Sequence, residues 1–370
     1  MSSHIYELFG YLTADHSAEA IRHRKECLCP FTGEECDGGG NRYQSFLNLD
    51  ARRDRQLVAF FNGRKDNIPA GVCSLLTTNQ VWIVCPRRLF ALDHGVEHTT
   101  HEGFCENLLR RYAPSTRAQK AGVWSEVKMK YTEDGSEGDE ENEKSFDYTF
   151  DYIVCPTNPK LLSEVAASQE VTERKLESAL SKNGYTLARR NGRTYVEEYP
   201  DGIPLIIEVM TSSTSGGNKA KGTTIQNAFR QAILGNEQHA PGINYRQIWA
   251  RMVSQLIVKS QIGKAWGGKT IWILQDALAN YISSTTDLNL RKLMSQALKE
   301  VNLLTLRYQQ GRRQRTGTVP LEVDSLYAGE IPPIHGDTDF NKLLQAASIP
   351  PKDVLEAKLL SKRPRTFILM

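Results

Sequence analysis

Alternating hydrophobic and polar positions in the second half of the chain predict a set of strands. The segment Phe146–Val154 combines aromatic and β-branched residues, which are typical of a strand. The runs Arg193–Glu198 and Pro204–Met210 predict a strand pair, because the Pro200-Asp201-Gly202 segment between them has strong turn chemistry. Three more strands are predicted at Lys269–Leu274, Val301–Gln309 and Gly317–Val323, the last two forming a hairpin around the basic tip Gly311–Arg315.

Helical periodicity fills the intervals between these strands. An amphipathic helix is predicted over Lys160–Ser181, where Asn183-Gly184 ends it. Two further helices are predicted at Thr223–Leu234 and Tyr245–Ile262, and others between the strand at 269–274 and Glu300. The second of these helices carries apolar residues at Ile248, Met252, Leu256 and Ile257. This order of elements predicts an α/β core with a mixed sheet flanked by helices.

Length and local composition predict two main domains within the 370 residues. Seven acidic residues among the eleven at 133–143 have nothing to bury, which is typical of a solvated linker. We therefore predict a loop-rich, cysteine-containing front domain at 1–130, an acidic linker at 131–144 and the α/β core at 145–330. A C-terminal helical extension would follow at 331–370.

Charge and hydropathy narrow the classes of function. The net charge is +3, but residues 131–150 carry −7 and residues 151–370 carry +8, which favours a polyanionic partner for the core. Mean hydropathy is −0.45, and no apolar run approaches the ~20 residues of a membrane span. The segment Met1–Tyr11 carries Glu7 and lacks the pattern of a signal peptide. These features argue against a membrane or secreted protein and predict a cytoplasmic location.

One carboxylate stands inside an otherwise apolar predicted strand. Glu208 shares a strand face with Ile206 and Met210, whereas Asp147 and Asp151 share a face of the strand at 146–154. Carboxylates from adjacent strands can hold a divalent cation against a phosphate, which is the arrangement of Mg²⁺-dependent nucleases. The alternative is a structural Glu208 that pairs with a nearby arginine. Asp201 is expected to be a turn residue.

The seven cysteines include a set that could ligate a metal ion. Cys29, Cys36, Cys73 and Cys85 are separated by six, thirty-six and eleven residues, so they lack Cys-x-x-Cys knuckles. Four thiolates can hold Zn²⁺ or iron in a tetrahedral site that organises a loop-rich domain. The alternative is a scatter of buried, reduced cysteines.

Short motifs follow one another along the chain in a fixed order: Ile5-Tyr-Glu-Leu-Phe-Gly10, Cys29-Pro-Phe31, Cys36, Gly71-Val-Cys73, Trp82-Ile-Val-Cys-Pro86, Phe146-Asp-Tyr-Thr149, Ile207-Glu-Val-Met-Thr211 with Lys219 beyond it, and Arg251-Met-Val-Ser-Gln-Leu256. Taken together and in this order, they resemble the NotI-type restriction endonucleases. The similarity covers roughly residues 5–325.

The resemblance implies a homodimeric type II site-specific deoxyribonuclease with a PD-(D/E)xK core and a separate four-cysteine domain. Cys29, Cys36, Cys73 and Cys85 would then hold one iron or zinc ion per chain. Asp147 and Glu208 would bind Mg²⁺, with Asp151 left open as the alternative to Asp147. The third motif position falls on Met210, where the family has Lys or Gln; a thioether carries no charge and cannot replace them. Lys219, or else Gln226, is expected to take that role.

Double-stranded DNA with a palindromic, G·C-rich site is the substrate that the resemblance implies, in a prokaryote that also holds a cognate methyltransferase. Two other functions remain open: a non-catalytic DNA-binding protein with a disabled site, and a metalloprotein unrelated to nucleic acid. Candidate DNA contacts are Arg52, Arg53, Arg87, Arg88, Lys221, Arg312 and Arg313.

Overall fold

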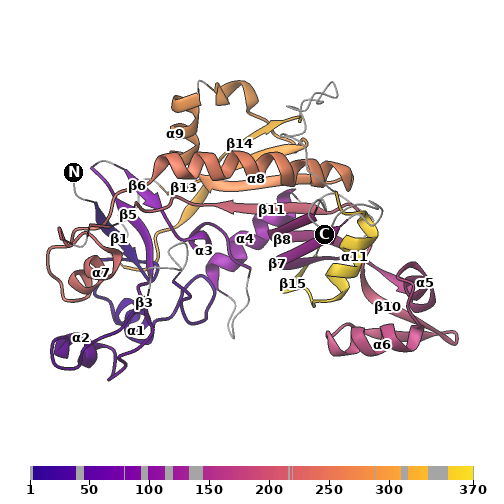
Figure 1. The fold of residues 1–370 in the computed structure, drawn as a ribbon, viewed down its shortest axis with the longest axis horizontal. Coiled ribbons are helices and arrows are strands. Elements are labelled where there is room, and N and C mark those ends of the chain that lie inside the picture. Colours follow the sequence, from indigo (N-terminus) through magenta and orange to yellow (C-terminus); the bar gives the residue numbers. More distant parts are fainter. Residues whose placement is uncertain are drawn as a thin grey trace, which may run out of the picture.

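A mixed sheet runs through the centre of the computed structural model (Figure 1). Within the described residues it has nine strands in the order β14-β13-β12-β11-β8-β10-β9, with β7 paired to β8 and β15 paired to β7. The described residues are 3–38, 46–78, 80–92, 99–112, 120–132, 145–215, 217–218, 220–286, 288–309, 316–331 and 349–369. The strands are β7 (Lys120–Thr132), β8 (Ser145–Leu161), β9 (Leu187–Arg190), β10 (Arg193–Pro200), β11 (Leu205–Met210), β12 (Lys269–Gln275), β13 (Val301–Tyr308), β14 (Leu321–Gly329) and β15 (Thr366–Leu369).

Helices cover this sheet, and the longest of them, α8, lies along β11 and β12 (Figure 1). Asn244 caps its first turn by accepting a hydrogen bond from the backbone N–H of Gln247. The helices beyond β8 are α5 (Leu162–Ser168), α6 (Glu173–Lys182), α7 (Ile225–Ile233), α8 (Tyr245–Ala265), α9 (Asp276–Thr286), the 3₁₀ helix η3 (Leu290–Leu293) and α11 (Lys352–Leu360). The predicted α/β class with a mixed sheet is confirmed.

The front of the chain builds a smaller unit against the end of the sheet. An antiparallel four-stranded sheet has the order β2-β1-β5-β6, and β3 pairs with β4. Figure 1 shows that the helices α3 and α4 of this unit lie on its side toward strands β7, β8 and β11. Its elements are β1 (His4–Leu8), β2 (Tyr11–Leu12), α1 (Ala18–Glu26), β3 (Phe46–Leu47), α2 (Arg55–Phe60), β4 (Ile68–Pro69), β5 (Val72–Leu76), β6 (Val81–Ile83), α3 (Pro86–Leu89) and α4 (Thr100–Tyr112).

The predicted hairpin of β10 and β11 is wrong. The two strands pair antiparallel with successive parts of β8, since Pro200 lies opposite Thr157 and Leu205 opposite Val154. The Pro-Asp-Gly segment therefore interrupts one strand path without reversing it. A single long β8 supplies the hydrogen-bonding partners for both strands, which local turn chemistry could not reveal.

The predicted helix at 160–181 also differs from the structure. β8 continues to Leu161, and two helices follow in place of one. Glu170 adopts a φ of +52°, which a continuing helix does not allow, and Thr172 then caps α6 by accepting from Lys175 N–H.

Strand pairing joins the predicted front domain, the core and the C-terminal extension, which the composition of the sequence had separated. β7 lies inside the predicted front domain, yet it pairs with β8 along the large sheet. The predicted C-terminal extension contains the expected helix α11, and it also adds β15 to β7. The predicted linker lies outside the described residues from 133 to 144.

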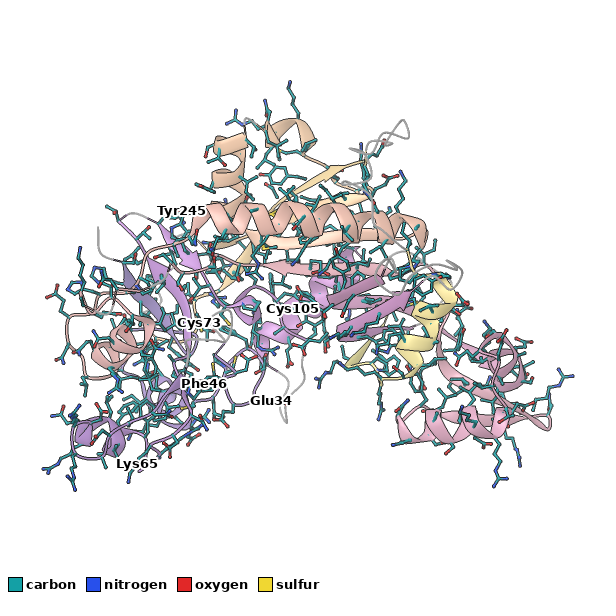
Figure 2. All side chains as sticks on the ribbon, viewed as in Figure 1. Glu34, Phe46, Lys65, Cys73, Cys105 and Tyr245 are labelled. Carbon is teal, nitrogen blue, oxygen red and sulfur yellow. The ribbon has the colours of Figure 1, made fainter. Side chains whose placement is uncertain are left out.

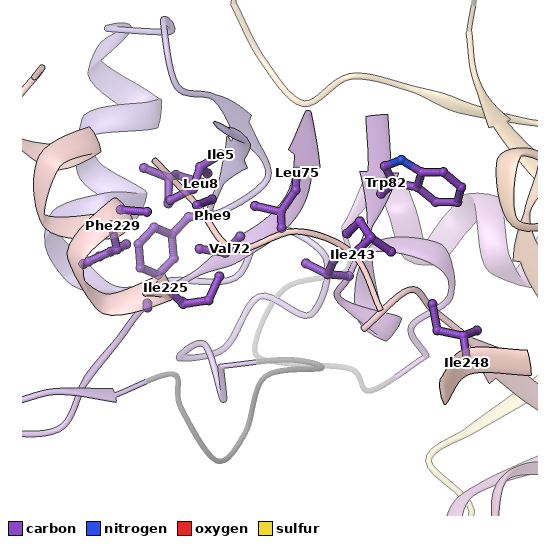
Figure 3. Close-up of a cluster of buried hydrophobic side chains, with 14 of the residues drawn as sticks. Ile5, Leu8, Phe9, Val72, Leu75, Trp82, Ile225, Phe229, Ile243 and Ile248 are labelled. Atoms are coloured by element: carbon purple, nitrogen blue, oxygen red, sulfur yellow. The ribbon is translucent and has the colours of Figure 1, made fainter. Parts of the chain in front are cut away.

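The largest hydrophobic cluster crosses the same predicted boundary (Figure 3). Phe9 of the front unit packs against Phe229 of α7, and Trp82 of β6 packs against Tyr245 of α8. Burial of these large apolar side chains favours association of the front unit with the helices over the sheet. The buried residues labelled in Figure 3 are Ile5, Leu8, Phe9, Val72, Leu75, Trp82, Ile225, Phe229, Ile243 and Ile248.

A buried charged network ties the two parts together more specifically. Glu7 on β1 and Arg88 on α3 form an ion pair with an Nη2–Oε1 distance of 3.1 Å, and both side chains are at most 1% exposed. Ser74 and Tyr308 donate hydrogen bonds to Oε2 of Glu7 at 2.7 and 2.6 Å. Arg88 also donates to the carbonyl of Val319, so this network reaches strand β13 and the segment before β14.

None of the helices in the described part of the chain combines the length and apolar character that crossing a bilayer requires.

We expect Arg88→Ala to lower the free energy of unfolding by about 3–5 kcal/mol, because the change leaves Glu7 buried without its cation. Arg64→Ala is the matched control, since Arg64 forms an exposed ion pair with Glu35 at 2.6 Å and its loss is expected to cost less than about 1 kcal/mol. Urea unfolding of the two variants measures the difference. Equal destabilisation would contradict the role of the buried network.

Candidate active site

A buried ion pair marks the centre of the candidate site. Glu208 on β11 is 2% exposed and Lys259 on α8 is 3% exposed. Nζ of Lys259 lies 2.5 Å from Oε2 of Glu208 and also donates to the carbonyl of Thr149 at 2.7 Å. Since charges this deeply buried must be compensated, the helix ammonium holds the strand carboxylate in place.

Asp151 on the neighbouring strand completes this group. The register of β8 with β11 pairs Tyr152 with Ile207, which brings Asp151 next to Glu208. Oδ2 of Asp151 accepts from the backbone N–H of Val209 at 2.8 Å, and its own N–H donates to Oε1 of Glu208 at 3.4 Å. Each carboxylate thus accepts a hydrogen bond from a backbone N–H of the neighbouring strand.

The negative charges of the Asp151 and Glu208 carboxylates repel each other. Burial, followed by the negative charge of Asp151, raises the pKa of Glu208 to about 8, although Lys259 acts in the opposite direction. A positively charged ligand at this position would relieve the repulsion between the carboxylates.

A small pocket of about 50 Å³ opens beside Asp151. It is lined by Asp151, Val209, Glu126 of β7 and Arg87 of α3, among others. Glu126 has a φ of +47°, and the β7–β8 register, with Ser125 opposite Tyr152 and Val127 opposite Phe150, places it across from Asp151. A non-glycine residue in this conformation inside a strand is unusual. A volume of about 50 Å³ has room for a few waters or an ion, but not for a nucleotide.

Asp147, the expected partner of Glu208, lies elsewhere. It is exposed near the start of β8, where Lys130 and Lys128 approach its carboxylate at 3.3 and 3.9 Å. Asp151, which the sequence left open as the alternative, is the aspartate that contacts the Glu208 region. The registers of β8 with β7 and with β11 decide between the two residues.

Lys259 was missed by reasoning from the sequence. Met210 packs against the largest hydrophobic cluster, and Lys219 lies outside the described residues. Gln226 is on α7, which packs against β1, whereas Lys259 contacts Glu208 directly. The sequence did contain a signal: the buried stripe of α8 runs through Ile248, Met252 and Ile262, and Lys259 interrupts it.

The predicted DNA-contacting residues have different fates. Arg88 is buried in the Glu7 network, so its guanidinium is not a surface contact, and that prediction is wrong. Arg87 is partly buried and pairs with Asp37 at 3.0 Å. Arg52, Arg53 and Lys221 are exposed in turns, whereas Arg312 and Arg313 lie outside the described residues.

The four predicted metal ligands, Cys29, Cys36, Cys73 and Cys85, lie close together but do not have the geometry of a metal site. Cys29, Cys73 and Cys85 share a small buried cluster with Phe31 and Ala91, and Cys36 packs against it. Cys73 hydrogen-bonds to Cys85, which raises the pKa of the Cys73 thiol and lowers that of Cys85. Over the described residues, no three His, Cys, Asp or Glu side chains are arranged so that they could hold a metal ion. The structure therefore shows the convergence but no four-cysteine metal cluster.

Comparison with known proteins adds no family: neither a protein-family model nor a curated protein matches this chain. The geometry of Asp151, Glu208 and Lys259 consequently carries the functional argument.

The raised pKa of Glu208 predicts a pH-dependent stability. The folded state retains a proton at Glu208 up to about pH 8, whereas an unfolded glutamate loses it near 4.5, so this contribution to stability declines as pH rises between these values. Glu208→Gln should therefore gain stability relative to the wild type between pH 5 and pH 8.5. Urea unfolding at both pH values measures this, with the exposed Glu164→Gln as control. A wild-type-to-variant difference that does not change with pH would contradict the prediction.

Proposed function

We propose that this chain is a Mg²⁺-dependent site-specific deoxyribonuclease of the type II restriction class. The observation that carries the proposal is the grouping of Asp151, Glu208 and Lys259 within hydrogen-bonding distance at the junction of β8, β11 and α8. Two strand carboxylates and one ammonium are the residue types that a PD-(D/E)xK nuclease requires. Here the lysine would come from a helix, in place of the strand position that Met210 occupies.

The donor set fits Mg²⁺. This ion prefers oxygen ligands and is commonly held by one or two carboxylates together with substrate phosphates, so a third protein carboxylate is not needed. Asp151 and Glu208 would hold it, and the repulsion that raises the pKa of Glu208 favours a cation between them. A bound Mg²⁺ would offset the negative charge that develops on the phosphate oxygens during hydrolysis.

The chain's own residues would divide the remaining work. Lys259 holds the carboxylate of Glu208 in one orientation. Its positive charge would add to that of the metal ion on the developing charge of the phosphate. Asp151 is fixed by its bond from the Val209 N–H, which leaves little freedom to the carboxylate next to the pocket. Preorganised groups of this kind lower the barrier because they do not have to reorient during the reaction.

Duplex DNA is the substrate that the charge distribution favours, since residues 151–370 carry eight excess positive charges. A palindromic, G·C-rich site and a homodimer are part of the same proposal. So are a prokaryotic cytoplasmic setting and a cognate methyltransferase. A non-catalytic DNA-binding protein is the alternative that the next experiment distinguishes.

We expect the wild type with Mg²⁺ to cut plasmid and phage DNA into discrete fragments. Asp151→Asn should slow cleavage by roughly 10²-fold or more, because it removes a carboxylate from the cation site. Asp147→Asn is the matched control on the same strand and should cut at nearly the wild-type rate. A plasmid that is shifted but intact would instead indicate a DNA-binding protein without nuclease activity.

The same assay tests the assignment of the lysine. Lys259→Gln should also lose roughly 10²-fold or more, because it removes a preorganised positive charge that orients Glu208. Met210→Leu, a change confined to the apolar cluster, should cut normally. Circular dichroism of each variant shows that it is folded. A fully active Lys259→Gln would contradict the assignment.

A structural metal at the cysteines belongs to the same proposal. The convergence of Cys29, Cys36, Cys73 and Cys85 supports one iron or zinc ion per chain, for which small movements of the thiols would be needed.

Elemental analysis tests the metal. We expect one equivalent in the wild type and almost none in Cys73→Ser, because a thiolate ligand is lost. Cys105→Ser is the matched control: Cys105 is equally buried, but it lies on α4 away from Cys73 (Figure 2), and its loss should leave the metal content unchanged. Metal-free but folded wild-type protein would contradict this proposal.

A further inference from the structure

The pocket beside Asp151 is assembled from two parts of the chain that lie far apart in sequence. Asp151 and Val209 come from β8 and β11, whereas Pro86, Arg87 and Phe90 come from α3 and the residue after it. Phe90 packs edge-on against Tyr152, with ring centroids 5.0 Å apart, which fixes the position of α3 over the sheet. Arg87 is the cationic side chain that the front unit contributes to this pocket.

Arg87 is held in place from its other side. Its Nε and Nη2 both donate to Oδ2 of Asp37, at 3.2 and 3.0 Å, and its side chain is 22% exposed. Asp37 directly follows Cys36, and Arg87 follows Cys85 by two residues. The cysteine cluster therefore anchors both partners of the ion pair, so that its packing sets where the guanidinium sits.

The electrostatics of the pocket call for a cation. Asp151 and Glu126 both line it, and a phosphodiester is itself an anion, so carboxylates alone would repel the substrate. A guanidinium carries five donor hydrogens in a planar fork, and it can hold a carboxylate and a phosphate oxygen at the same time.

We propose that Arg87 binds the phosphate that is cleaved, and so brings a catalytic residue from the cysteine-containing front unit into the active site. This inference rests on the proposed nuclease function and extends it. Asp37 is then a positioning residue, and the packing of the cysteine cluster fixes the ion pair that holds Arg87 at the Asp151 pocket. A contact that strengthens as charge builds up on the phosphate raises the cleavage rate more than the affinity for DNA.

The test separates cleavage from binding. Single-turnover cleavage at saturating enzyme with Mg²⁺ is compared with the dissociation constant for the same DNA in Ca²⁺, for the wild type, Arg87→Ala and Arg87→Lys. We expect Arg87→Ala to lower the cleavage rate by roughly 10²-fold or more, in line with other arginines that stabilise phosphoryl transfer. Its dissociation constant should rise by less than about 10-fold, the scale of one lost phosphate contact. Arg87→Lys, which keeps the charge but loses the fork, should fall between Arg87→Ala and the wild type.

Arg64→Ala is the matched control. Arg64 also pairs with an acidic residue next to Cys36, namely Glu35, but it does not line the Asp151 pocket, and its variant should cleave at the wild-type rate. If Arg87→Ala cuts as fast as Arg64→Ala while Asp151→Asn does not cut, the inference is wrong and the nuclease proposal stands. Equal losses in rate and affinity would make Arg87 an ordinary DNA contact and would also overturn the inference. If the wild type does not cut DNA, both fall together. Should Arg87→Ala fail to fold, Arg87→Lys alone decides by the same comparison.

Discussion

A carboxylate buried in the middle of a sheet has to be compensated, and that requirement organises the centre of this molecule. Glu208 lies between Asp151, whose negative charge raises its pKa, and Lys259, whose ammonium lowers it, and it accepts a hydrogen bond from the backbone N–H of Asp151 and from Nζ of Lys259. Replacing such a group with an apolar residue would remove its desolvation cost, so a buried ion pair is weak evidence of a purely stabilising role. An arrangement that keeps two acids and an amine together despite this cost is therefore a candidate functional site.

The same constraint joins the front unit to the sheet. Glu7 and Arg88 are buried together, and Tyr308 and Ser74 complete the hydrogen bonding around the carboxylate. Because every member of this network depends on residues from another element, the front unit has one well-defined position against β13. Arg87, the neighbour of Arg88, is positioned by the same helix. A network that stabilises the assembly and a side chain that we propose to be functional thus occupy adjacent residues of α3.

The cysteine cluster fits into this scheme as a local anchor. Cys36 directly precedes Asp37, and Cys85 lies two residues before Arg87, its ion-pair partner. The packing of these thiols therefore influences where Arg87 lies in the pocket lining. The front unit therefore does more than pack against the large sheet, because the shape of the candidate site depends on how its cysteines are held.

The sequence by itself determined the fold class and the apolar strand that carries Glu208, because these features follow from short-range periodicity and residue type. The resemblance suggested that four of the seven cysteines come together, but their convergence is a long-range contact that only the tertiary structure shows. Only the tertiary structure decided that Asp151, and not Asp147, lies beside Glu208. The two aspartates share one predicted face of one strand, and only register between strands separates them. The partner of the lysine could not be located either: Lys259 interrupts the apolar stripe of α8, but it is fifty-one positions from Glu208 and reaches it only when α8 packs across the sheet. Long-range pairing, which the free energy of the whole fold sets, placed the charged residues that local patterns could only suggest.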